Sequence, residues 1–193
     1  MTIMGLLLTA TVPTLGDMAA SSRRTKYLSD LSSLFETARQ YAVAKNTYVW
    51  VAFSDAGNNT TPLYAVAVAS RDGLAHGYGP DDAWPGQTID MATDANFTPV
   101  TRVLPLGSFK FDSDGVHFDN AAKFKVKAGG ASQVILARSV VFSPAGEARI
   151  APGIQGNITF SASATEGKLA RVIDTVIVNG PTGFLTVQNG SAN

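Results

Sequence analysis

Residues 31–43 read Leu-Ser-Ser-Leu-Phe-Glu-Thr-Ala-Arg-Gln-Tyr-Ala-Val, and residues 48–53 follow as Tyr-Val-Trp-Val-Ala-Phe. In the first stretch, apolar side chains recur every three or four residues, which is the spacing of one face of an α-helix. In the second stretch, β-branched and aromatic residues stand side by side, which is typical of a strand. The change of period predicts a helix that is followed directly by a sheet.

The helical pattern extends backwards from residue 31. Residues 17–45 contain neither proline nor glycine, so we expect an amphipathic helix over residues 17–46. One apolar stripe on this helix consists of Tyr27, Leu31, Leu34, Phe35, Ala38 and Ala42. We expect the last five to form the core between helix and sheet. The opposite face is expected to be polar and carries Arg24, Asp30, Ser33, Glu36 and Gln40.

The start of the chain is apolar and uncharged. Residues 1–12 read Met-Thr-Ile-Met-Gly-Leu-Leu-Leu-Thr-Ala-Thr-Val. Such a segment is shorter than the roughly 20 residues that cross a bilayer, and it lacks the basic start of a signal peptide. A buried core helix is the other alternative. If the segment is helical, Pro13 should kink the helix rather than end it. We therefore separate an apolar segment, residues 1–16, from a globular domain, residues 17–193.

The remainder of the domain, residues 47–193, consists of short β-prone runs separated by turn signals. Expected strands span residues 48–53, 63–69, 108–111, 116–118, 134–137, 140–142, 148–150, 158–162, 170–178 and 184–187. Many short strands after one helix predict an α+β fold, in which a long N-terminal α-helix packs on antiparallel β-sheet. Residues 71–102 are expected to form a long solvated loop.

Composition excludes several classes of function. The chain of 193 residues has 15 basic and 15 acidic side chains and no cysteine, and 45% of its residues are hydrophobic. Balanced charge removes the electrostatic case for nucleic acid, and the absence of cysteine removes thiol chemistry and disulfides. His76 and His117 are the only histidines, and there is no Gly-x-Ser-x-Gly elbow. We expect no enzyme activity, no cofactor and no metal.

Three local features have a functional and a structural interpretation. Residues 112–115, Asp-Ser-Asp-Gly, resemble the start of a calcium loop, but the twelfth position is Lys123 where a glutamate is needed. A hairpin turn is therefore favoured there. The lysines at 123, 125 and 127 alternate on one side of a possible strand and are expected to be solvated. Within the expected loop, Tyr78 and Trp84 are the first candidates for contact with a partner, because interface anchors tend to be aromatic.

Three stretches together carry a resemblance to a known family. The first is residues 3–13, Ile-Met-Gly-Leu-Leu-Leu-Thr-Ala-Thr-Val-Pro; the second is residues 31–43 with the strand at 47–51. The third comprises Val-Phe-Ser-Pro-Ala-Gly at 141–146 and Ile-Val-Asn-Gly-Pro-Thr-Gly-Phe-Leu at 177–185. In this order they resemble type IV pilin-like proteins, specifically the H-type minor pseudopilin and FimT-like group. A narrower resemblance is to pilin-like cassette proteins of the Verrucomicrobia.

The resemblance implies a pilin-like fold and a structural role. Such a subunit waits in the bacterial inner membrane and is then drawn into a pilus or a type II secretion pseudopilus, in the periplasm or at the cell surface. Its partners would be other pilin or pseudopilin subunits. The implied packing residues are Ile3, Met4, Gly5, Leu6, Leu7, Leu8, Val12 and Pro13, and the implied turn residues are Phe142, Pro144, Gly146 and Gly183. Some relatives of this kind bind DNA through a basic C-terminal patch. Residues 182–189 have no lysine or arginine, so nucleic acid is not an expected partner.

The family also has a basic leader, a cleavage site after glycine, and a glutamate soon after it, none of which is present here. By register with Gly5 and Pro13, we expect the chain to begin roughly nine residues past the mature terminus. Either the start codon is assigned late or the leader was left out. The alternative function is an extracellular β-rich binding or adhesion domain whose first residues are a signal remnant. A more distant one is a secreted enzyme that uses the loop at 71–102.

Overall fold

The computed structural model describes residues 2–54, 63–75, 88–106, 109–112, 123–128, 132–150, 156–164 and 173–190. One helix, α1 (Thr2–Lys45), precedes all the strands. The first strands are β1 (Val49–Phe53), β2 (Tyr64–Ser70), β3 (Thr88–Asp90), β4 (Phe97–Pro99), β5 (Leu104–Pro105) and β6 (Phe109–Asp112). They are followed by β7 (Lys123–Ala128), β8 (Ser132–Leu136), β9 (Arg138–Phe142), β10 (Ala148–Arg149), β11 (Asn157–Ala164), β12 (Ile173–Asn179) and β13 (Leu185–Gln188). The protein is thus α+β.

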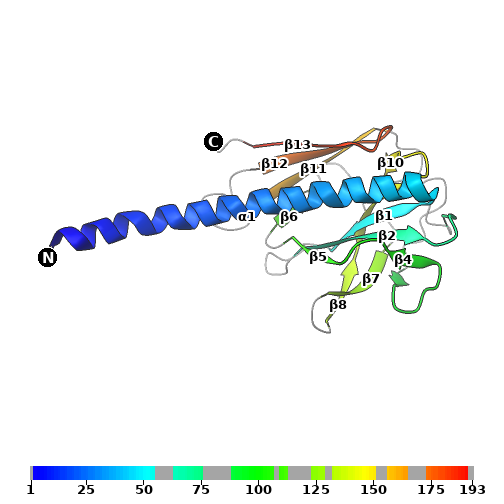
Figure 1. Ribbon diagram of the computed structural model, residues 1–193, viewed down its shortest axis with the longest axis horizontal. Helices are drawn as coiled ribbons and strands as arrows, with labels where there is room; N and C mark the ends of the chain where they lie inside the picture. The colour runs from blue at the N-terminus through cyan, green and yellow to red at the C-terminus, as the bar shows by residue number, and fades with distance from the viewer. Residues whose placement is uncertain are drawn as a thin grey trace.

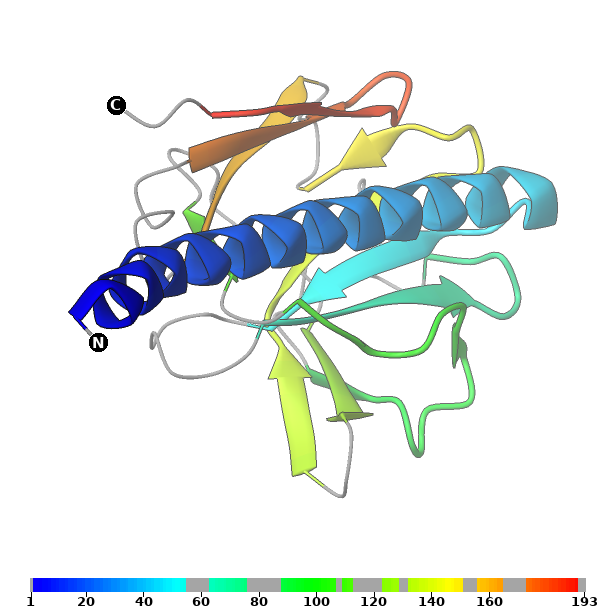
Figure 2. The same ribbon diagram turned by 60° about the vertical axis from the view of Figure 1, so that its left-hand side comes forward.

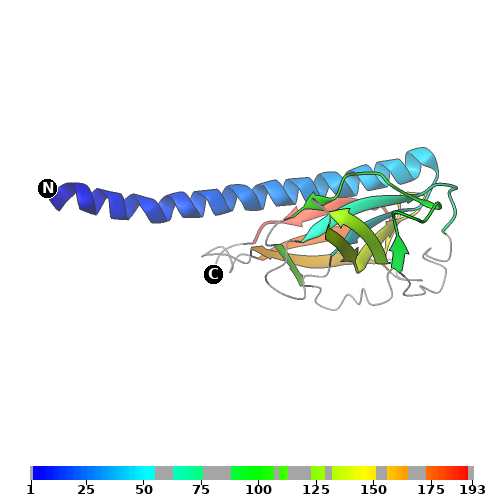
Figure 3. The ribbon, with the colours of Figure 1, turned by 90° about the horizontal axis from the view of Figure 1, so that it is seen from below.

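Within the described residues, the strands form three sheets. The central sheet has the order β10-β9-β1-β2-β4, with β5 also pairing with β2. A second sheet has the order β13-β12-β11-β6, and a small third sheet has the order β3-β7-β8. Every pairing is antiparallel except that of β3 with β7. In the view of Figure 1, α1 crosses the molecule with β11–β13 above it and β1–β2 below it, and Figure 3 shows that these strands lie on one side of the helix.

The central sheet is covered on both faces, which explains why its middle strands β1 and β2 are almost continuously apolar. Alternate residues of β1 point to opposite sides: Val51 and Phe53 join the core cluster beneath α1, while Trp50 joins a second cluster. That second cluster contains Phe97 of β4 and Phe124 of β7, whose ring centroids lie 5.4 Å and 6.1 Å from that of Trp50. The small third sheet therefore packs against the side of the central sheet that faces away from the helix.

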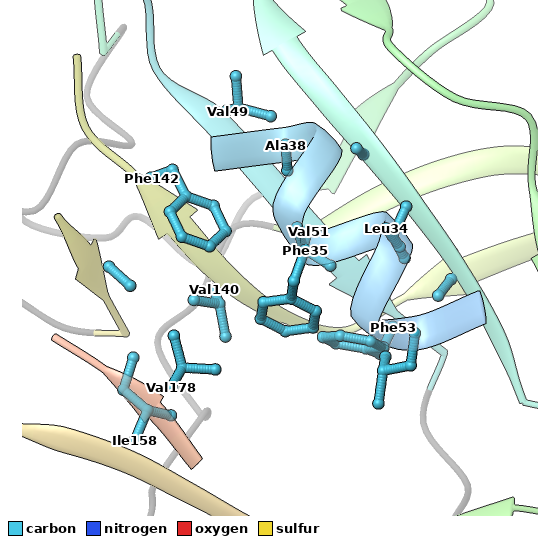
Figure 4. Close-up of a cluster of buried hydrophobic side chains, with 14 of the residues drawn as sticks. Leu34, Phe35, Ala38, Val49, Val51, Phe53, Val140, Phe142, Ile158 and Val178 are labelled. Atoms are coloured by element: carbon cyan, nitrogen blue, oxygen red, sulfur yellow. The ribbon is translucent and has the colours of Figure 1, made fainter. Parts of the chain in front are cut away.

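The predicted apolar stripe of α1 lies in the core. Leu31, Leu34, Phe35, Ala38 and Ala42 are all buried. Figure 4 shows the Phe35 side chain directed between the aromatic rings of Phe53 on β1 and Phe142 on β9. Its ring stacks on Phe53 at a centroid distance of 5.8 Å and meets Phe142 edge-on at 6.0 Å. Facing alanines on β2, which are buried in the same cluster, leave room for the helix to approach the sheet closely.

The helix passes through Pro13 and ends at a defined cap. The structure has one uninterrupted helix from Thr2 to Lys45, so Pro13 does not end it. At the other end, Asn46 adopts φ +51°, and the Thr47 N–H donates to the Ala42 carbonyl at 3.0 Å. A left-handed residue directly after the last helical turn is a common helix terminator, and asparagine tolerates that conformation. The chain can therefore reverse into β1 within three residues.

The described parts of residues 71–102 correct the expectation of a long solvated loop. They contain β3 and β4, which pair with β7 and β2 respectively. Phe97 on β4 is buried. The short lengths of these strands explain why a pattern of alternation could not identify them, since three residues give hardly more than one period. The expected strand at 116–118 and the turn at 113–115 lie outside the described residues.

Candidate functional site

The N-terminal part of α1 projects away from the sheets. Figures 1 and 3 show it extending past the ends of the strands, and Figure 2 shows the same part coming forward of the domain. At 1.5 Å per residue, the whole helix is about 66 Å long. The segment proposed for packing, listed above from Ile3 to Pro13, lies on the projecting part. Among the described residues, no helix combines the length and the hydropathy needed to cross a membrane.

A buried ion pair marks the point where α1 joins the domain. Asp174 on β12 is 0% exposed. Its Oδ2 accepts a hydrogen bond from Arg24 Nε at 2.6 Å, and its Oδ1 accepts one from Arg24 Nη2. The Gly190 N–H also donates to Oδ1, at 3.0 Å. The carboxylate thus ties together the helix, the second sheet and the segment after β13.

The position of Arg24 corrects the expected polar face of the helix. Its side chain is only 16% exposed, and it points to the domain instead of to solvent. The spacing 24, 28, 31, 35, 38 and 42 continues the apolar stripe, so Arg24 stands on the inward face by helical geometry. That spacing is the signal by which the sequence could have identified it. Nothing in the sequence around residue 174 marks Asp174 as its partner.

A second junction holds the other end of α1. Arg39 Nε donates to the Thr182 carbonyl at 2.8 Å, and the Arg39 guanidinium carbon lies 4.1 Å from the centroid of the Phe184 ring. Gly183, between them, has φ +67°, and a Cβ there would overlap the carbonyl oxygen of Gly146. Gly146 in turn has φ +85°. Both turns therefore require glycine. At Gly146 the reason is the positive φ; at Gly183 it is the positive φ together with the lack of space for a Cβ.

This junction, which we call the Arg39 junction (Arg39, Phe142, Gly146, Thr182, Gly183 and Phe184), unites distant parts of the sequence. The Phe142 ring is also within 3.0 Å of the position of a Cβ at Gly183. Pro144 lies in the turn between β9 and β10, which the Gly146 N–H closes by donating to the Ser143 carbonyl at 2.8 Å. The helix end and the two C-terminal turns that resemble the pilin-like family thus meet in one place.

Between the two junctions runs an open groove, with α1 on one side and the end of β13 on the other. Its volume is about 580 Å³. The helix side is lined by Arg24, Thr25, Leu28, Ser29 and Ser32, and the β13 side by Val187 and Asn189. Most of its surface is apolar. Leu28 and Val187 are only partly buried, because the core cluster covers one side of each and the groove leaves the other open.

The lysines of β7 lie on the outer face of the third sheet. Lys127 is exposed, and Lys125 Nζ donates to Asp90 Oδ2 on β3 at 3.0 Å. The Ala92 N–H donates to Asp90 Oδ1 at 3.0 Å, and this bond, followed by the bond from Lys125, lowers the pKa of Asp90. One of the three lysine charges is therefore already compensated.

The remaining candidates of the sequence analysis lie outside the described residues: Tyr78, Trp84, His76, His117 and Asp114. Among the described residues, no group of three or more histidine, cysteine, aspartate or glutamate side chains is arranged to hold a metal ion.

No family model, curated protein or solved structure matches the chain. The resemblance to pilin-like proteins therefore stays a prediction.

Proposed function

We propose that the protein is a structural subunit of a type IV pilus or type II secretion pseudopilus and assembles through its apolar N-terminal helix. Before assembly it would reside in the bacterial inner membrane, with its globular domain in the periplasm. The observation that supports this most is the projection of α1 beyond its own sheets (Figures 1 and 3). The projecting part includes residues 2–16, whose side chains carry no charge.

An apolar helix that its own domain does not cover is unfavourable in water. Each Å² of apolar surface removed from water contributes about 25 cal/mol. Lipid and neighbouring apolar helices both remove such surface, so the same segment is suited to a membrane and to the core of a filament. Gly5, Thr9 and Ala10 are small enough to allow close approach of helices.

The shape of the molecule favours an open assembly. The projecting segment lies at the start of α1, whereas the groove beside Arg24–Ser32, the surface that would receive it, lies further along the same helix. Contacts between two different surfaces are heterologous, and they produce filaments when the rotation between subunits does not close.

The Arg39 junction gives independent support for a pilin-like domain. Arg39 belongs to the second stretch that carries the resemblance, and Gly146 and Gly183 belong to two separate parts of the third, yet the three residues lie together. Stretches that resemble a family only by chance have no reason to meet at one packing site.

A charge placed in the apolar segment tests the proposal. In Leu7→Asp, assembly would bury an unpaired carboxylate, so we expect the fraction of protein that sediments as assembly to fall at least about tenfold. Ser21→Asp is the control, because residue 21 is exposed on the same helix. Sedimentation after removal of detergent provides the measurement, and urea unfolding checks that both variants fold.

The same experiment separates the proposal from the adhesion alternative. If the first residues are only a signal remnant, Leu7→Asp and the unsubstituted chain will sediment alike. That result would contradict a structural role for the apolar segment.

A further inference from the structure

We propose that the groove between α1 and β13 receives residues 2–16 of a second copy of this chain. The inference rests on the proposed function and specifies which surface of one subunit holds the apolar helix of the next. The bound segment, which we call the occupant, is thus a helix. Its binding site on the receiving subunit, which we call the host, consists of α1 and the edge strand β13.

The groove is suited to an uncharged helix. Among the described residues that line it, Arg24 alone is charged, and Asp174 compensates that charge from within the domain. Residues 1–16 are equally free of charge. Thr25, Ser29 and Ser32 give the helix wall small side chains, which permit close approach of another helix, while Leu28 and Val187 offer apolar contact.

The lengths and charges agree with one parallel register. If the second copy is shifted by about 22 residues along the helix axis, or about 33 Å, its Thr2 comes level with Arg24 and its Leu7 with Ser29. The same shift brings Asp17, the first charged residue of the chain, level with Arg39. Residues 2–10 would then lie along the groove, whose helix wall runs from Arg24 to Ser32, and Asp17 would lie at the level of a guanidinium.

The register also predicts which host residues lie near the occupant beyond the end of the groove. Beyond Ser32, the groove gives way to the Arg39 junction, where Phe184 is 53% exposed beneath the guanidinium. This exposed ring lies where the occupant helix reaches its own polar part. The groove would therefore cover the first part of the occupant, residues 2–10, and the Phe184 ring would lie near its Asp17.

Crosslinking can test the register because the chain has no cysteine of its own. The double variant Leu7→Cys/Ser29→Cys, in the full chain, is assembled, pelleted and treated with a short bismaleimide. The two positions are about 33 Å apart within one helix, so a crosslink between them must join two copies. We expect a ladder of covalent multimers. The control Leu7→Cys/Lys127→Cys places the second thiol on the outer face of the third sheet and should give no ladder.

A groove-filling pair provides a second test. Ser29→Trp inserts a large side chain into the groove, whereas Ser33→Trp places the same side chain on the exposed face of the helix. Overpacking of an interface should raise the protein concentration needed for assembly at least about tenfold for Ser29→Trp, with little change for Ser33→Trp. Urea unfolding verifies that both variants keep their folded domain.

Each outcome decides the inference. A ladder with the Ser29 pair alone, together with impaired assembly of Ser29→Trp, supports it. Pelleted assemblies that give no ladder, or a crosslinked product that stops at the dimer, would overturn the groove register and leave the proposed function intact. Failure of the unsubstituted chain to sediment at all would overturn both.

Discussion

Asp174 shows how a single buried charge can position a long helix. Its carboxylate accepts hydrogen bonds from Arg24 and from the Gly190 N–H, and no part of it reaches solvent. A buried ion pair need not add net stability, but the loss of one partner leaves the other charge uncompensated. The pair therefore fixes where α1 meets the domain, whatever its net contribution to folding.

The substitution Asp174→Asn keeps the shape of the side chain and removes its charge. Because Arg24 would lose its counter-ion, we expect the free energy of unfolding to fall by about 3 kcal/mol. The exposed pair of Lys26 and Asp30 offers a control: Lys26→Ala should change it by less than about 0.5 kcal/mol. Urea unfolding monitored by circular dichroism measures both. Equal stability of the two variants would contradict a structural role for the buried pair.

The Arg39 junction depends on a glycine that cannot be replaced without strain. Gly183→Ala would combine a positive φ with overlap of the Gly146 carbonyl oxygen, so we expect a loss of about 2 kcal/mol or more in the free energy of unfolding. Gly156→Ala is the matched control, because a Cβ there meets nothing within 4 Å. Thermal and urea unfolding compare the two. Equal stability of Gly183→Ala and Gly156→Ala would contradict the close packing of the turn at Gly183 against the turn at Gly146.

At the scale of elements, the helix and the main strands follow from periodicity. The apolar stripe from Leu31 to Ala42 predicted which face of α1 is buried, and the aromatic and β-branched run at 48–53 predicted β1. The strand β7 was identified only as a possible strand from its alternating lysines, and β3, β4 and β5 were missed, because two or three residues do not establish a period. Their strand character depends on pairing with β7 and β2, which is a tertiary effect.

The candidate site was only partly predictable for a related reason. The apolar segment is evident from residues 1–16, since composition alone shows it. The groove is not, because one wall comes from α1 and the other from β13, more than 150 residues later. Likewise, the pairing of Arg24 with Asp174 joins residues that only the folded chain brings together.

The packing of α1 on the sheets can be tested at Phe35. Removal of its ring in Phe35→Ala leaves a cavity between Phe53 and Phe142, and we expect a loss of about 3–5 kcal/mol in the free energy of unfolding. Val43→Ala is the control on the same helix, because Val43 is half exposed and should cost little. Urea unfolding of both variants distinguishes a packed helix from a loosely attached one, for which the two losses would be alike.

At the scale of the whole molecule, two parts of one helix have different surroundings. From Arg24 onward, α1 is integrated into the core of the domain through an ion pair, an apolar stripe and the Arg39 junction. The N-terminal part of the helix extends past the strands (Figure 3). Folding is therefore expected not to need the projecting segment, so that this segment can be removed and assembly lost while the domain stays folded.

The sedimentation velocity of a chain that lacks residues 1–20 tests this separation most directly, because the deletion removes the projecting segment and spares Arg24. We expect a monomer that no longer assembles, and its urea unfolding midpoint should match that of the folded domain in the full chain. If the shortened chain unfolds, the apolar segment stabilises its own domain; if it still assembles, other surfaces join the subunits. Either result would contradict the account.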